Sequence, residues 1–329
     1  MGKYQNVGTP RFYIDYFQWG LTTGLITVND ISNSFDADNN ELKKLFYLNP
    51  PNSNTFLINQ GEHYFDINTK YLSDEFYNLN YCMFLNHNLS NTPLLVDIYG
   101  LDKTSIVNYE ELAVFSYNGW SYIDITPDIS EGNNFDSSLE KFIFTNTSSP
   151  VNLSLGAISM GTKYEMPHSP DLDLTMTREF GGASKKWTTS GRLLTNYNYT
   201  HPPLWGDGEA WGLYTEEVPN LGARRSGRRT WDLKFSYISD SDLMADMEML
   251  NLNADADTSD YNDYLIGDNF FSQFMQKTLG GSLKFIFQPN GEDYNPDGFA
   301  ICILDQDSIS IKQVAHNTYN ISLKIMEVW

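Results

Sequence analysis

The amino-acid sequence predicts a mainly β protein with two β-sandwich-type domains, one of which carries one or two α-helices. Three observations predict this class. The 329-residue chain exceeds the usual size of a single hydrophobic core. Its 21 Tyr and 20 Phe favour strands over helices. Short apolar segments recur about every ten residues between turns that contain Asn, Gly or Pro, which is typical of antiparallel sandwiches.

The first 50 residues are expected to form an N-terminal arm and a linker. Residues 9–26 contain so many aromatic side chains that they must be covered, either by their own domain or by a neighbouring subunit. The tract 29–54 is rich in Asn, Asp and Ser, with one short helical candidate at 40–46. We assign residues 1–50 to an arm and linker that pack on the C-terminal domain.

Residues 51–160 are expected to form a peripheral β-sandwich. Its clearest strands are expected at 94–100, 111–117 and 141–145, with a closing strand at 151–160. The dipeptide Asn118-Gly119 predicts a two-residue hairpin turn.

Residues 161–329 are expected to form a second sandwich, which we call the hub domain. Trp231, Leu233, Phe235 and Tyr237 alternate with polar residues, and this period of two predicts a strand with one buried face. After this strand, Ser239 is the expected N-cap of a helix.

The rest of the hub domain has equally local signals. A second helix is expected at 269–279, ended by the pair Gly280-Gly281. Strands are expected at 283–288 and 299–304, and a hairpin at 308–325 closes the domain.

The net charge of the chain disfavours some function classes. A formal charge of −21 disfavours wrapping DNA or lying on an anionic membrane. We find no signal peptide and no apolar stretch approaching a membrane span, so we expect an aqueous compartment such as a host cytoplasm. The only cysteines are Cys82 and Cys302, so no disulfide framework is expected.

Motifs that carry chemistry are missing from the sequence. It contains no phosphate-binding loop, dinucleotide fingerprint, zinc-protease helix motif or nucleophile elbow, and its five histidines lack ligand spacing. Two Asp-rich tracts, 36–40 and 255–263, resemble the start of a calcium loop. Glu41 and Asp260 occupy the positions where such a loop needs glycine, so we interpret both as solvated loops. We therefore predict no catalytic residue, no cofactor and no metal.

Segregated charges and aromatic residues point to self-association. Four arginines lie within six positions, and the following stretch 240–268 holds nine acids and no Lys or Arg. Oppositely charged patches on one subunit fit a head-to-tail ring, in which two different surfaces meet. An intrachain contact between the two patches explains the pattern equally well, and arginines that face DNA are a third interpretation. The expected interface residues are Arg224, Arg225, Arg228, Arg229, Asp240, Asp242, Asp246, Phe12, Tyr13, Tyr16 and Trp19.

Several segments also carry a family resemblance. They read GTKYEMPHSPDL at 161–172, GG at 181–182, PPLWG at 202–206, SGRRTWDL at 226–233, TLGG at 278–281, FIFQP at 285–289, VAH at 314–316 and KIMEVW at 324–329. These segments resemble tail-associated structural proteins of marine phages and the ends of distal-tail and minor-tail proteins of long-tailed phages. The resemblance covers about residues 156–329 and the first 26 residues.

This resemblance implies a virion structural protein rather than an enzyme. It implies a ring, usually of six copies, at the end of a phage tail, as a distal tail or baseplate hub component assembled in the host cytoplasm. Implied partners are further copies of the chain and the tail tube, hub and fibre proteins. In that family a second, often lectin-like sandwich projects outward, but here it would be inserted early in the chain rather than at the C-terminus.

Alternative functions remain open from the sequence. A carbohydrate-binding adhesin would hold host surface glycans through exposed rings such as Tyr117, Trp120 and Tyr122. A head-to-tail adaptor or neck protein belongs to the same structural class as a tail-end ring. An enzyme that degrades cell-surface polymers is the third alternative. Neither a membrane nor sequence-specific nucleic acid is an expected partner.

Overall fold

The computed structural model of the protein is mainly β, with antiparallel sheets and a few short helices, as the sequence predicts. The structure describes residues 7–29, 39–49, 54–68, 80–89, 92–100, 105–108, 119–124, 139–179, 183–197, 228–244, 267–294 and 298–328.

A ten-stranded antiparallel sheet forms the body of the molecule. Its order is β12-β15-β19-β17-β16-β1-β11-β5-β8, and β18 pairs with β19 beside this path. The strands are β1 (Arg11–Asp15), β5 (Tyr81–Leu85), β8 (Trp120–Asp124), β11 (Ala157–Glu165), β12 (Thr175–Glu179), β15 (Arg228–Ser239), β16 (Phe285–Gln288), β17 (Ala300–Leu304), β18 (Ile311–Ala315) and β19 (Thr318–Glu327).

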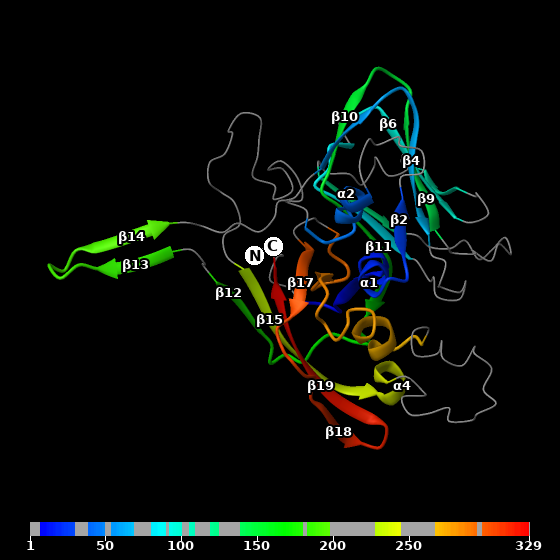
Figure 1. The fold of residues 1–329 in the computed structure, drawn as a ribbon. Coiled ribbons are helices and arrows are strands. Elements are labelled where there is room, and N and C mark those ends of the chain that lie inside the picture. Colours follow the sequence, from blue (N-terminus) through cyan, green and yellow to red (C-terminus); the bar gives the residue numbers. More distant parts are fainter. Residues whose placement is uncertain are drawn as a thin grey trace.

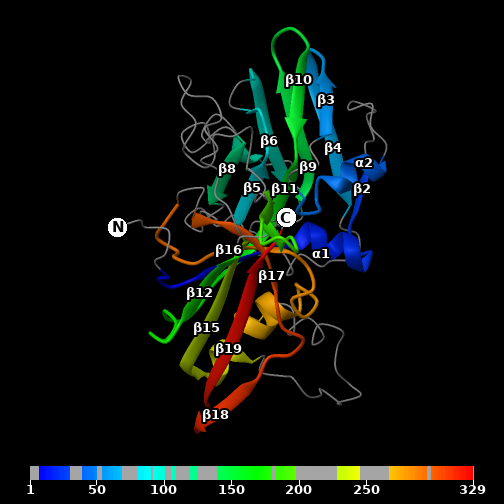
Figure 2. The same cartoon turned by 90° about the vertical axis from the view of Figure 1, so that its left-hand side faces the viewer.

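Among the described residues, three smaller sheets accompany this body. The five-stranded one has the order β2-β4-β9-β6-β7, and the two-stranded ones pair β3 with β10 and β13 with β14. Their strands are β2 (Thr27–Asn29), β3 (Asn54–Ile58), β4 (Gly61–Asn68), β6 (Leu94–Gly100), β7 (Ser105–Asn108), β9 (Leu139–Asn146), β10 (Val151–Leu155), β13 (Ala183–Trp187) and β14 (Leu193–Tyr197). In Figures 1 and 2 the strands β4, β6, β9 and β10 gather at one end, opposite β18 and β19.

The helices are short, and their caps follow from local sequence. They are α1 (Tyr16–Thr23), α2 (Asn39–Lys44), α4 (Asp240–Leu243) and a π-helical segment at Phe271–Met275. The Asp15 carboxylate caps α1 by accepting from the backbone N–H groups of Phe17 (2.9 Å) and Gln18 (3.0 Å). Gly24 ends α1 with a φ of 78°, a conformation that glycine adopts without steric cost. In the part of the chain that is described, no helix is both long and apolar enough to span a bilayer.

The N-terminal strand joins segments that the sequence had assigned to different domains. β1 pairs with β11 on one side and with β16 on the other. The ring of Phe12 on β1 lies 4.7 Å from the ring of Phe274 and 5.2 Å from that of Phe287, measured between centroids. Strands β5, β8 and β11 therefore share a sheet with the expected hub domain, and no sheet boundary falls at residue 160.

Two strand predictions need correction. The expected closing strand 151–160 is divided into β10 and β11, which join different sheets. In β15 the buried alternation holds from Trp231 to Phe235 and then changes phase, because a bulge lies between Phe235 and Ile238. As a result Ile238 is buried and Tyr237, which was expected inside, is 76 % exposed.

Other expected elements are confirmed. The helical candidate at 40–46 corresponds to α2, the helix expected at 269–279 contains the π-helical segment, and Gly280 and Gly281 follow it with φ values of 71° and 81°. The strands expected at 94–100, 141–145, 283–288 and 299–304 and the hairpin at 308–325 are present, with small shifts of their ends. The strand expected at 111–117, and Asn118 of the expected turn, lie outside the described residues.

Candidate subunit interface

The expected aromatic interface residues lie inside their own chain. Phe12 and Tyr13 are 0 % exposed, and Tyr16 and Trp19 are 4 % and 6 % exposed. All four side chains are buried within their own chain, so a neighbouring copy cannot reach them. The N-terminal segment is therefore covered by its own chain rather than by a neighbouring subunit. These four residues do not form a subunit interface.

Arg229, expected at the interface, is instead part of a buried ion pair. Its guanidinium donates to both carboxylate oxygens of Glu327, at 2.9 and 3.0 Å, and to the carbonyl of Phe299 at 3.1 Å. It also lies 5.1 Å from the ring centroid of Trp231. With 2 % of Arg229 exposed, the predicted contact to a second subunit cannot form through this side chain.

The remaining charged residues lie at the two ends of one strand. Arg228 begins β15, and α4, which contains Asp240 and Asp242, starts directly after β15 ends. An extended strand of this length separates them by roughly 40 Å, so Arg228 and Asp240 do not form the intrachain contact considered above. The carboxylate of Asp242 already has a partner within its own chain, since it accepts a hydrogen bond from the hydroxyl of Ser239 at 2.7 Å. The other predicted members, Arg224, Arg225 and Asp246, lie outside the described residues.

The proposed glycan-binding rings also require correction. Trp120 is 1 % exposed, with its ring centroid 4.7 Å from that of Phe299, and Tyr122 is 9 % exposed. A sugar stacks on an exposed ring face, whereas the rings of Trp120 and Tyr122 are covered by the protein's own core. Tyr117 lies outside the described residues.

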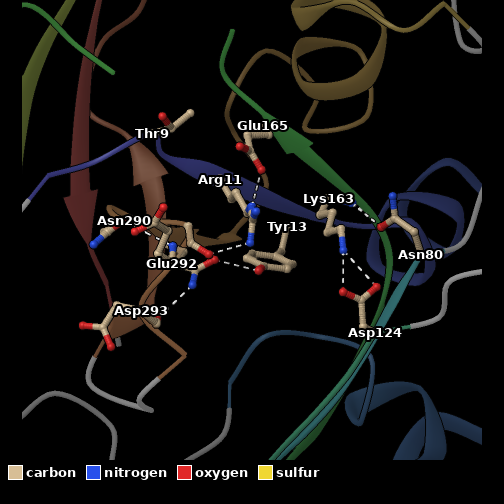
Figure 3. Close-up of polar contacts among 12 residues, drawn as sticks. Thr9, Arg11, Tyr13, Asn80, Asp124, Lys163, Glu165, Asn290, Glu292 and Asp293 are labelled. Atoms are coloured by element: carbon tan, nitrogen blue, oxygen red, sulfur yellow. Dashed lines mark hydrogen bonds and ion pairs between the residues drawn. The ribbon is translucent and has the colours of Figure 1, made fainter. Parts of the chain in front are cut away.

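A polar cluster around Arg11 fastens the loop after β16 to β1 (Figure 3). Arg11 pairs with Glu165, and it donates to the carbonyl of Gly291 at 2.5 Å and to the hydroxyl of Tyr294 at 2.8 Å. Close by, the hydroxyl of Tyr13 donates to Gln288 at 2.7 Å. These bonds join the N-terminal strand β1 to residues 288–294 and help to hold β1 at the centre of the sheet.

A second polar cluster is fully inside the protein, at the start of α1. The ammonium of Lys277 donates to Gln273 at 2.9 Å and to the hydroxyl of Tyr16 at 2.5 Å, and the hydroxyl of Thr162 donates to the same Tyr16 oxygen. Burial lowers the pKa of Lys277 to about 7. Because Lys277 is 3 % exposed and Tyr16 is 4 % exposed, we assign this cluster to the core rather than to chemistry on a ligand.

The β13–β14 hairpin is the surface that sequence reasoning missed. It pairs with no other strand among the described residues, and Figure 1 shows it extending away from the ten-stranded sheet. Trp187, Leu193 and Leu194 are 71 %, 41 % and 50 % exposed. The sequence did carry a signal, since two short apolar-containing runs flank Ser190-Gly191.

The tip of this hairpin is well formed. The N–H of Thr188 donates to the carbonyl of Arg192 at 2.9 Å, and the N–H of Arg192 donates to the hydroxyl of Thr188 at 3.0 Å. Gly191 supplies the positive φ of 79° that the turn requires. Trp187 is therefore exposed on a regular hairpin rather than on an irregular loop.

Comparison with protein-family models, with curated proteins and with solved structures gave no match for this chain. Among the described residues, no group of three or more His, Cys, Asp or Glu side chains is placed to hold a metal ion. The two Asp-rich tracts at 36–40 and 255–263 lie largely or wholly outside those residues. The exposed apolar residues of the β13–β14 hairpin, Trp187, Leu193 and Leu194, make it the candidate site.

Proposed function

We propose that this protein is a structural subunit of a phage tail, which assembles with copies of itself into a ring at the tail end and carries no catalytic activity. The proposal rests on the resemblance of its sequence segments to distal-tail and minor-tail proteins. One structural observation supports self-assembly: the body buries its own core, whereas the β13–β14 hairpin leaves Trp187 and two leucines uncovered.

An isolated two-stranded hairpin is marginally stable in water, and a large exposed ring on it favours association. Covering Trp187 alone would remove more than 100 Å² of apolar surface from water, worth on the order of 2 kcal/mol. A subunit of a ring provides this cover without any further protein. A tail-end ring and a neck ring meet this requirement equally well, so position on the particle has to be measured.

Oligomeric state is the first test. We expect light scattering and electron microscopy of the purified full chain to show a closed ring, of six copies by the resemblance. An antibody against the chain should then label phage particles at the free end of the tail, whereas a neck protein would be labelled at the head junction. A chain that stays monomeric at high concentration and never co-sediments with particles would contradict the proposal.

Two of the three rings predicted to bind glycans, those of Trp120 and Tyr122, are buried in the core. No described observation favours glycan binding over assembly. A glycan array probed with the full chain should show no binding.

A further inference from the structure

The exposed surface of the β13–β14 hairpin, which we call the hairpin arm (residues 183–197), has a defined apolar face. Trp187 and Leu193 are directly opposite each other in the strand register, so their side chains lie on the same face. Lys186 and Leu194 form the adjacent pair, which faces the other side. The Trp187 face is the more apolar of the two, and it needs a flat apolar partner.

The hairpin arm is also a basic segment of an acidic protein. Residues 183–197 contain Lys185, Lys186 and Arg192 and no acidic residue, whereas the whole chain has a net charge of −21. Any surface that receives the arm should therefore be negative as well as partly apolar, because opposite potentials guide and orient protein association.

A described surface that combines an exposed aromatic ring with acidic residues lies on β15, and we call it the bulge face. It is the outer side of β15 around Tyr237, together with residues 171–173. At the bulge, Tyr237 has a φ of 66°, a conformation that a bulky residue rarely adopts, and its ring is 76 % exposed. Bulges commonly re-aim a side chain, and here the bulge turns an aromatic ring out of the core towards solvent. Leu172 is fully exposed, and its neighbour Asp171 bonds to Lys234 and Ser236 of β15.

The charges on this side of the sheet are mixed, with a small excess of acid. The outer side of β15 and β19 carries Lys234 and Lys324, each in an ion pair with an aspartate, Asp173 at 2.8 Å and Asp305 at 2.6 Å. Asp171 and Asp232 add two negative charges, and Lys312, which pairs with Asn320 of β19, adds a third positive one, so four aspartates face three lysines. The bulge face is thus slightly acidic, opposite in sign to the hairpin arm.

The arm and the bulge face of one copy are directed apart. β12 leads into the arm, and its last residue, Glu179, pairs with Arg228 at the start of β15. Tyr237 lies near the other end of β15, and in Figure 1 the arm points away from β15. Two different surfaces that cannot meet within one copy fit a heterologous contact between neighbours, and such contacts form a ring when the rotation between copies closes.

We infer that the hairpin arm of each copy docks on the bulge face of the next copy. This inference rests on the proposed assembly into a ring, and it specifies the two surfaces. Trp187 and Leu193 contact Tyr237 and Leu172, while the basic residues of the arm face the aspartates. The partner is a second copy of this chain.

Two variants of the full chain test this contact. The arm variant is W187S with L193S. The face variant is Y237N, because asparagine tolerates the positive φ while the ring is removed. Leu57→Ser is the matched control, since Leu57 is 56 % exposed on β3, away from both surfaces. Circular dichroism and thermal unfolding of each variant verify that it folds.

We expect the arm variant and the face variant each to be monomeric, with association weakened at least about tenfold, and the control to assemble like wild type. Mixing the two monomeric variants should yield dimers and nothing larger, because only one intact arm and one intact face then meet. If Y237N assembles like wild type, or the mixture stays monomeric, this docking is wrong and ring assembly still stands. A wild-type chain that is itself monomeric would overturn both.

Discussion

Arg229 and Glu327 form an ion pair whose side chains are 2 % and 3 % exposed, inside a protein with a large negative charge. Taking both ions out of water is costly, and the pair is tolerated because Arg229 also reaches the carbonyl of Phe299 and the ring of Trp231. Removing one partner would leave the other charge buried without its counter-ion. This pair therefore links β15 to β19 inside the protein.

Glu327→Gln should lower the free energy of unfolding by about 3 kcal/mol, because Arg229 keeps its charge and loses its counter-ion. Chemical denaturation at neutral pH measures the change. The matched control is Asp173→Asn, which breaks the exposed pair with Lys234 and should leave stability nearly unchanged. Equal effects of the two substitutions would contradict the assigned role of burial. The double variant of Arg229→Met with Glu327→Leu should recover much of the loss.

Lys277 makes stability depend on pH in the alkaline range. Burial lowers the pKa of Lys277 from the ordinary 10.5 to about 7, so between these values the unfolded chain binds a proton that the folded chain lacks. The free energy of unfolding should therefore rise with pH from about 7 to 10.5, with a slope of about 1 kcal/mol per pH unit from this group. Lys277→Met should remove this contribution in a pH series of denaturant titrations. An unchanged slope in the variant would refute the assignment.

Strand β11 depends on a glycine where it meets β1. Gly161 is paired with Asp15, and a Cβ added to Gly161 would lie 1.9 Å from the carbonyl oxygen of Ile14. That atom belongs to the backbone, so the strain cannot be relieved by a side-chain rotation. The close approach sets β1 in register at the point where α1 begins.

We expect Gly161→Ala to destabilise the fold by about 3 kcal/mol or more, because β1 and β11 must move apart. Thermal unfolding measures this. Gly24→Ala serves as control, since a Cβ there meets no atom and only the positive φ of 78° opposes it, at about 1 kcal/mol. If Gly161→Ala lowers stability as little as Gly24→Ala does, the close approach of β1 and β11 does not fix their register.

The ten-stranded sheet contains strands from all three of the segments into which the sequence was divided. β5 and β8 lie at one end of this sheet, and β11 joins them to β1. The core around Trp120 and Tyr81 includes Tyr13 from the N-terminal segment and Phe299 from the C-terminal one. Parts of the chain far apart in sequence thus complete one interior.

A fragment of residues 51–160 should accordingly fail to fold when expressed alone. It would lack β1, which pairs with β11, and it would expose rings that Tyr13 and Phe299 normally cover. We expect an aggregated or unfolded product by circular dichroism and gel filtration. The full chain purified in parallel is the control. A stable, monomeric fragment would restore the peripheral domain that the sequence predicted.

Features decided by neighbours along the chain were predictable from the sequence. The buried alternation from Trp231 to Phe235, the N-cap at Ser239 and the stop at Gly280 each depend on a few adjacent residues, and each is present. The mainly β class follows from the same local patterns. Sequence reasoning also recognised that the aromatic N-terminal segment must be covered.

Features decided by contacts between distant segments were not predictable. Which strand pairs with β1, where β15 bulges to expose Tyr237, and that Arg229 meets Glu327 all depend on partners more than 80 residues away in the chain. Hydrophobic periodicity reports that a face is buried, but it carries no information on what buries it. For that reason Phe12, Trp120 and Arg229, expected on binding surfaces, belong to the interior, while the hairpin arm emerged as exposed only once the strands were paired.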